Sequence, residues 1–136
     1  MTQVNQPAHI TKTQLWAGRI LSALPALFLI VDGGMKLAKP QPVVEATVGL
    51  GYPESTIIGL GIVLLACTAI YLIPRTSILG AILLTGYLGG AVATHVRVGG
   101  SLFPIFFPVF LGVLVWGGLW LRDHRLRALL PWQSPG

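Results

Sequence analysis

Four ionisable side chains lie near the ends of apolar segments, where they could form a binding or proton-transfer site. Asp32 and Lys36 stand four residues apart near the end of the first apolar segment, and His95 and Arg97 close the third. An acid inside a membrane helix is costly, and such acids tend to have a function. Arginine stabilises a neighbouring aspartate as the anion, whereas a neutral histidine could pass it a proton. We therefore take these four residues as the candidate ligand-binding site.

The composition indicates that the elements holding these residues are membrane helices. The chain has 136 residues, of which 54% are hydrophobic and 10% are charged. A soluble domain carries about 25% charged residues, and a membrane helix needs about 20 apolar ones. The apolar segments predict helices over about 15–38, 55–73, 78–98 and 103–121. The expected fold is all-α, a four-transmembrane-helix antiparallel bundle within one membrane domain, residues 14–122.

The basic residues predict how the bundle is oriented. With both termini on one side, that side holds six Lys and Arg residues and the other side holds three. The positive-inside rule then places both termini in the cytoplasm of a multi-pass protein of the cell membrane. Residues 1–13 are expected to be a disordered cytoplasmic tail, and residues 123–136 a basic cytoplasmic tail. The four candidate residues then lie together toward the outer leaflet.

Helical geometry limits which of these residues can meet. Arg97 shares a helix face with Gly90 and Thr94, whereas His95 points roughly the opposite way. We expect Arg97, ahead of His95, to be the direct partner of Asp32, with Lys36 as the other ion-pair candidate. Two interpretations stay open: an ion-pair lock that holds the bundle, or a ligand or proton site with His95 facing another helix or a pocket.

Small residues in the third apolar segment predict close helix packing. Gly86 and Gly90 stand in GxxxG spacing, which lets helix backbones approach in lipid. We expect this face to contact another helix, either within the subunit or between two copies of the chain. In the long connection after the first segment, residues 43–48 suit a short surface helix.

Several classes of function are disfavoured by what the sequence lacks. The single cysteine, Cys67, excludes an intrachain disulfide and a CxxC site. Three dispersed histidines do not form a metal-ligand spacing. The bases lie at the ends of apolar segments, which disfavours nucleic-acid binding. No phosphate-binding loop or nucleophile elbow is present. No catalytic residue can be named, and whether the protein is an enzyme stays open.

Several motifs resemble those of the DoxX-like family of small four-helix integral membrane proteins. The most specific are Asp-Gly-Gly-Met-Lys-Leu at 32–37 and the glycine-rich block at 80–97, with further likeness at 19–24, 50–53, 71–76 and 116–122. The resemblance implies a four-helix membrane bundle. Founding members are linked to a thiosulfate:quinone oxidoreductase and others associate with redox-defence enzymes, which implies a quinone and a redox protein as candidate ligand and partner. The motif positions carried over are Arg19, Asp32, Gly33, Lys36, His95 and Arg97.

Two functions from different classes follow as hypotheses. The first is a DoxX-like membrane protein whose polar outer-leaflet pocket binds a small hydrophobic or quinone-like ligand, or supports a redox partner. The second is a structural subunit or assembly factor of a larger membrane complex, without a ligand site. In both, the lipid bilayer is the surrounding partner, and other membrane proteins or a second copy would contact the Gly86/Gly90 face.

Overall fold

A computed structural model describes residues 10–129, and all the regular secondary structure in this part of the chain is helical. The elements are α1 (Lys12–Ala38), α2 (Gln41–Gly49), the 3-10 turn η1 (Glu54–Thr56), α3 (Ile57–Leu72), the 3-10 turn η2 (Pro74–Thr76), α4 (Ser77–Arg97), α5 (Leu102–Arg122) and α6 (His124–Leu129). No strand occurs between residues 10 and 129. The predicted all-α class is confirmed.

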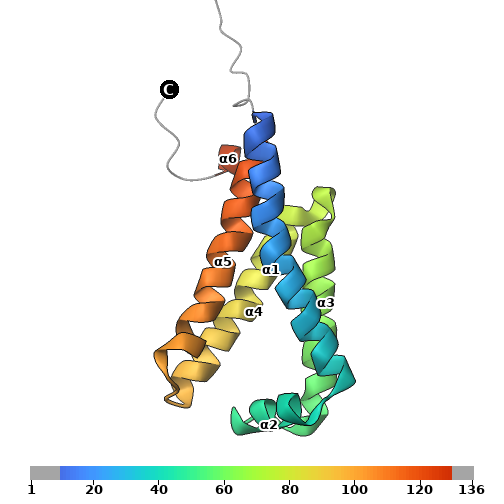
Figure 1. Cartoon of the computed structure of the whole chain (residues 1–136), viewed down its shortest axis with the longest axis vertical. Coiled ribbons are helices and arrows are strands. Elements are labelled where there is room, and N and C mark those ends of the chain that lie inside the picture. The colour runs from blue at the N-terminus through green and yellow to red at the C-terminus, as the bar shows by residue number, and fades with distance from the viewer. Residues whose placement is uncertain (1–9, 130–136) are drawn as a thin grey trace, which may run out of the picture.

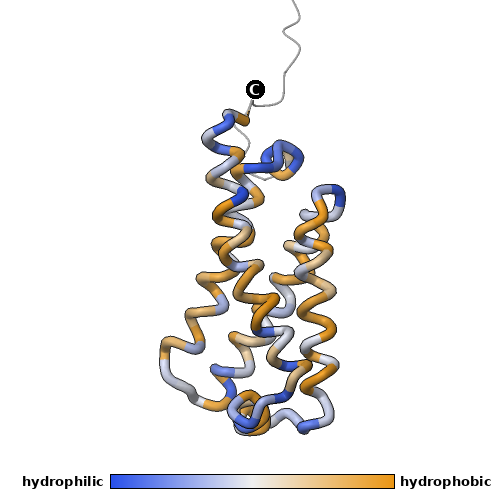
Figure 2. Tube along the Cα trace, turned by 45° about the vertical axis from the view of Figure 1, so that its right-hand side comes forward, coloured by the Kyte–Doolittle hydropathy of each residue, from blue (hydrophilic) through white to orange (hydrophobic). Residues whose placement is uncertain are grey.

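Four of the helices are long and apolar enough to cross a membrane: α1, α3 with η1, α4 with η2, and α5. Figure 2 shows apolar residues along most of their length and hydrophilic segments gathered toward the ends. Large hydrophobic side chains such as Leu27, Val113 and Phe103 are exposed on the outside of the bundle, as expected where lipid is the solvent. The predicted surface helix at 43–48 lies within α2.

The first helix begins earlier than the sequence suggested. Thr11 caps it in a reciprocal pair with Gln14, in which each side chain accepts from the other residue's backbone N–H. This capping box satisfies two of the first turn's N–H groups, so residues 12 and 13 belong to α1 rather than to the predicted tail. The remaining residues of the two predicted tails, 1–9 and 130–136, lie outside the described part.

The four long helices pack in a ring in which each has two main neighbours. α1 packs against α5 and α3, and α4 packs against the same two helices. Figure 1 shows α1 starting beside α5 and ending beside α3, so that it crosses the bundle obliquely. α2 lies across the end of the bundle opposite α6 (Figure 1). Side chains from all four helices, including Leu29, Leu64, Leu84 and Leu119, form the buried core.

Glycines mark the closest helix crossings. A Cβ on Gly18 would lie 2.8 Å from the Gly118 carbonyl oxygen where α1 meets α5, and a Cβ on Gly61 would lie 2.9 Å from the Gly33 carbonyl oxygen where α3 meets α1. A Cβ on Gly80 of α4 would overlap the backbone of Tyr71 in α3. Small residues are the usual means of close packing where lipid gives helices no hydrophobic reason to associate.

The Gly86/Gly90 face is not one of these crossings. A Cβ added at Gly86, Gly89 or Gly90 would meet no atom within 4 Å. The expected contact is therefore absent within the described chain, because α4 meets α3 and α5 through other faces. A contact between copies through Gly86 and Gly90 stays a prediction.

Candidate functional site

Asp32 is neutralised by a residue of its own helix. Its Oδ2 atom lies 2.8 Å from Lys36 Nζ, one turn further along α1. The acid-before-base order at this spacing is the favourable one for a helical pair. The Lys36 side chain is 15% exposed and lies against Gly61 of α3, whereas the Asp32 side chain stays 38% exposed. The charge of Asp32 is thus offset locally by Lys36, which the sequence offered as an ion-pair candidate second to Arg97.

The prediction that Asp32 pairs directly with Arg97 is wrong. Arg97 instead donates from Nη2 to the Leu50 carbonyl oxygen at 2.7 Å. Its guanidinium lies over Gly51, where φ is +94° and a Cβ would come within 2.9 Å of Nη2. Tyr52 adds a 2.7 Å hydrogen bond to Thr94. The last turn of α4 therefore holds the loop after α2 in place. The Arg97 guanidinium is hydrogen-bonded to a backbone carbonyl of that loop and not to the Asp32 carboxylate.

His95 is hydrogen-bonded to a backbone carbonyl of its own helix and not to Asp32. Its Nδ1 atom lies 2.8 Å from the carbonyl oxygen of Ala91, one turn earlier in α4. Tyr87 of α4 lies within electrostatic range of the Asp32 carboxylate. The four candidate residues therefore stand at one end of the bundle, with only Asp32 and Lys36 in direct contact among them.

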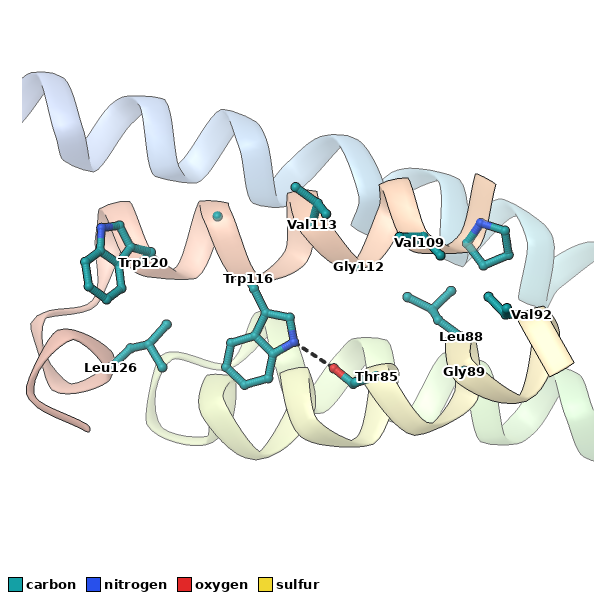
Figure 3. A pocket seen from close by; sticks show the side chains of 12 residues that line it. Thr85, Leu88, Gly89, Val92, Val109, Gly112, Val113, Trp116, Trp120 and Leu126 are labelled. Atoms are coloured by element: carbon teal, nitrogen blue, oxygen red, sulfur yellow. Dashed lines mark hydrogen bonds between the residues drawn. The ribbon is translucent and has the colours of Figure 1, made fainter. Parts of the chain in front are cut away.

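A long apolar groove between α4 and α5 is the feature that sequence reasoning missed. It has a volume of about 650 Å³, within the range of small-molecule sites. Figure 3 shows its two walls, with α6 at one end. Its lining residues are Thr85, Leu88, Gly89, Val92, Pro108, Val109, Gly112, Val113, Trp116, Gly117, Trp120 and Leu126. None of the four predicted site residues is among them.

The polar atoms in the middle of the groove are already satisfied. The Trp116 indole N–H donates to Thr85 Oγ1 at 2.7 Å (Figure 3). The Thr85 hydroxyl in turn donates to the Ala81 carbonyl oxygen at 2.7 Å. The walls thus present mainly apolar surface to an occupant. In the sequence, the feature that could have indicated the groove is the presence of glycines on both helices, at Gly89, Gly112 and Gly117. Because glycine has no side chain, these positions leave space between larger neighbours.

A second polar cluster, also missed, joins all four long helices at the α6 end. Arg122 of α5 donates from Nε to Ser22 Oγ of α1 at 2.9 Å and from Nη1 to Ser77 Oγ of α4 at 3.4 Å. Its guanidinium lies 5.0 Å from the ring centre of Tyr71 in α3. The Tyr71 hydroxyl lies 2.9 Å from Ser22 Oγ and donates to the Val115 carbonyl oxygen at 2.7 Å. From the sequence, Arg122 counted only among the six cations of the predicted cytoplasmic side.

Comparison with known proteins identifies the chain at the level of its family. A model of the DoxX-like family matches residues 20–118. The protein belongs to the DoxX-like family. No curated protein and no solved structure matches it. The matched range contains Asp32, Lys36, His95 and Arg97 and most of the groove, whereas Arg122 and α6 of this DoxX-like protein lie beyond it.

In this DoxX-like protein, Asp123 fixes the start of α6. Its carboxylate accepts from the Arg125 backbone N–H at 2.9 Å and from Arg125 Nη2 at 2.7 Å, so it caps the short helix and pairs with its second residue. Arg125 Nη2 also donates to the Pro74 carbonyl oxygen at 2.6 Å, which ties α6 to the turn between α3 and α4. Hydrogen bonding from Arg125 lowers the pKa of Asp123 below its ordinary value of 3.8.

We expect the docking of α6 to be lost in acid. The pKa of Asp123 is lower in the folded protein than its ordinary value. The stabilisation of the docked α6 by the Asp123 carboxylate is therefore complete above pH 3.8 and falls as the pH drops through and below that value. Amide hydrogen exchange of residues 124–129, corrected for intrinsic rates, should show protection at pH 6 that decreases below pH 4. Asp123→Asn should show reduced protection already at pH 6. Glu54→Gln, at an exposed pair with Lys39, is the matched control, and an equal effect there would contradict the assignment to Asp123.

Proposed function

We propose that this DoxX-like membrane protein binds the apolar chain of a membrane-dissolved ligand in the groove between α4 and α5. The groove itself is the observation that carries the proposal. Its volume of about 650 Å³ and its lining of mainly aliphatic and aromatic side chains and glycines suit a lipid or isoprenoid chain. Because both walls belong to membrane-spanning helices, a ligand can enter sideways from the bilayer without crossing water.

This proposal moves the ligand away from the polar pocket expected from the sequence. Asp32 is paired within α1, and Arg97 and His95 are bound to backbone carbonyls. A quinone ring needs hydrogen-bond donors for its carbonyl oxygens, and the Trp116 N–H in the middle of the groove is already bonded to Thr85. The groove therefore fits the isoprenoid tail of a quinone better than its ring.

Filling the groove from a glycine tests the proposal. Gly89 lines the groove and Gly86 does not, yet a Cβ at either position would meet no atom within 4 Å. Leucine is also a better helix former than glycine, so neither change should weaken α4. In the assay, the purified protein is washed with detergent that contains equal amounts of dioleoyl phosphatidylcholine and dioleoyl phosphatidylglycerol, and the phospholipid that stays bound is measured. We expect Gly89→Leu to lower the amount of bound phospholipid several-fold.

The control is Gly86→Leu, which makes the same change on the same helix outside the groove. It should retain as much of the two phospholipids as the unmodified protein. Both variants should have unchanged melting temperatures in detergent. If Gly89→Leu retains the full amount of both lipids while remaining folded, the groove is not a binding site for chains and the proposal fails.

The alternative function, a structural subunit or assembly factor, is favoured by the open glycine face. Gly86 and Gly90 are exposed and in GxxxG spacing, which suits contact with a helix of a second copy or of another membrane protein, including a redox partner. On this alternative, Gly86→Leu abolishes association in cross-linking of native membranes while lipid retention stays normal. Gly89→Leu would then leave lipid retention unchanged.

A further inference from the structure

The positive charge of this protein is concentrated at one end of the bundle. Six cations lie toward the end that carries α6, with one carboxylate, Asp123, whereas three cations and three carboxylates balance at the other end. The basic end is defined by Lys12, Arg19, Arg75, Arg122, Arg125 and Arg127. Asp123 is already bound by Arg125. The formal net charge of +5 is therefore located at the basic end.

The α4–α5 groove reaches this basic end. Trp120 and Leu126 line it there, and Leu126 of α6 is only 4% exposed. The guanidinium of Arg127 lies 5.4 Å from the ring centre of Trp120, and its Nε donates to the Trp120 carbonyl oxygen at 2.8 Å. Figure 3 shows Trp120 and Leu126 together at the α6 end of the groove. A cation is thus held against a residue that forms the groove wall.

Further cations stand beside this end of the groove. Arg125, whose side chain is 45% exposed, reaches the Pro74 carbonyl oxygen. Arg75 is the next residue after Pro74, and it is exposed. α6 therefore lies against the turn between α3 and α4, which brings Arg75, Arg125 and Arg127 to the same end of the bundle.

We propose that the groove takes an acyl chain of an anionic phospholipid, whose phosphate is bound at the basic end by the arginines of α6. The inference rests on the proposed function, since it names the class of ligand for the same groove. Arginine matches phosphate geometry through paired N–H donors, and each Lys or Arg near an anionic lipid surface adds attraction. A zwitterionic lipid would fill the groove equally well but would gain little from this excess of cations.

The same washing assay separates the headgroup from the chain. The probes are dioleoyl phosphatidylglycerol and dioleoyl phosphatidylcholine, which share their chains and differ in net charge. The unmodified protein should retain phosphatidylglycerol in preference. Arg127→Gln should lower the retained ratio of phosphatidylglycerol to phosphatidylcholine about fivefold, as expected for the loss of one cation near an anionic lipid. Arg127→Lys, which keeps the charge, should keep most of the preference.

Controls and outcomes distinguish this inference from the proposed function. Lys39→Gln removes a cation at the balanced end, where Lys39 is paired with Glu54 at 3.5 Å, and should leave the ratio unchanged. Gly89→Leu should lower retention of both lipids together. If Gly89→Leu removes both lipids but Arg127→Gln leaves the ratio unaltered, the groove binds chains and the anionic headgroup inference is overturned. If Arg127→Gln and Lys39→Gln lower the ratio equally, the effect is general electrostatics and the site at α6 is likewise overturned.

Discussion

Replacing Gly80 with alanine is expected to separate α3 from α4 and to destabilise the bundle by about 3 kcal/mol or more. A Cβ at Gly80 would overlap the backbone N and Cα atoms of Tyr71. Overpacking a core usually costs about 1–3 kcal/mol, and the upper end applies when the neighbour is a helix backbone that cannot rotate away. The melting temperature in detergent, followed by circular dichroism, measures the loss.

The matched control for Gly80→Ala is Gly86→Ala, six residues further along α4. Both changes replace glycine with alanine inside the same helix, where alanine is the better helix former. A Cβ at Gly86 meets no atom within 4 Å, so Gly86→Ala should leave the melting temperature unchanged or raise it slightly. Equal melting temperatures for the two variants would show that α4 can shift away from Tyr71, contrary to the close crossing.

The second large effect is expected at Tyr71, the largest fully buried side chain of the described residues. Tyr71→Ala removes a buried ring and should cost about 3–5 kcal/mol. Tyr71→Phe keeps the ring under the Arg122 guanidinium and removes only the hydroxyl that meets Ser22 and Val115. The loss of a buried hydrogen-bonding hydroxyl should cost about 1–3 kcal/mol.

Unfolding with increasing sodium dodecyl sulfate, at fixed detergent, compares the two Tyr71 variants. Tyr52→Phe is the control, because it also removes a tyrosine hydroxyl that bonds across elements, to Thr94, but from a half-buried side chain at the opposite end. Tyr52→Phe should cost about 1 kcal/mol or less. A larger effect at Tyr52 than at Tyr71 would place the main polar link between the helices at the loop end of the bundle.

The Arg122 cluster explains why these effects should be large at one end of the bundle. Arg122 contacts α1, α3 and α4 from the end of α5, and its Nη2 atom is buried with no hydrogen-bond partner in residues 10–129. A partly buried cation is tolerated when hydroxyls and an aromatic face replace its water. Ser22, Ser77 and Tyr71 supply these groups, so a change at Tyr71 disturbs contacts of all four helices.

The features that could be predicted from the sequence depend on neighbouring residues within one segment. Hydropathy alone indicates a membrane helix, because about 20 apolar residues suffice whatever the neighbours are. The pair of Asp32 and Lys36 follows from helical spacing, since residues four apart share a face. The position of the cations at segment ends was also visible, which is why the basic end could be recognised before any packing was known.

The features that could not be predicted depend on which helix faces turn toward one another. Arg97 was expected to form an ion pair with Asp32, but its guanidinium donates a hydrogen bond to the backbone carbonyl of Leu50 instead. The Gly86/Gly90 spacing indicated a crossing, yet α4 meets α3 at Gly80, where Tyr71 lies against it. Many small residues permit close approach, and the sum of packing over all four helices selects the ones that are used.

Hydropathy, charge positions and motifs alone indicate a four-helix membrane protein of the DoxX-like family with one strongly basic end. The packing of the helices against one another produces the groove between α4 and α5, the junction at Arg122 and the docking of α6 beside Trp120. The physical reason is that hydropathy and helical spacing act within one helix, whereas a groove exists only where two packed helices leave space between their side chains.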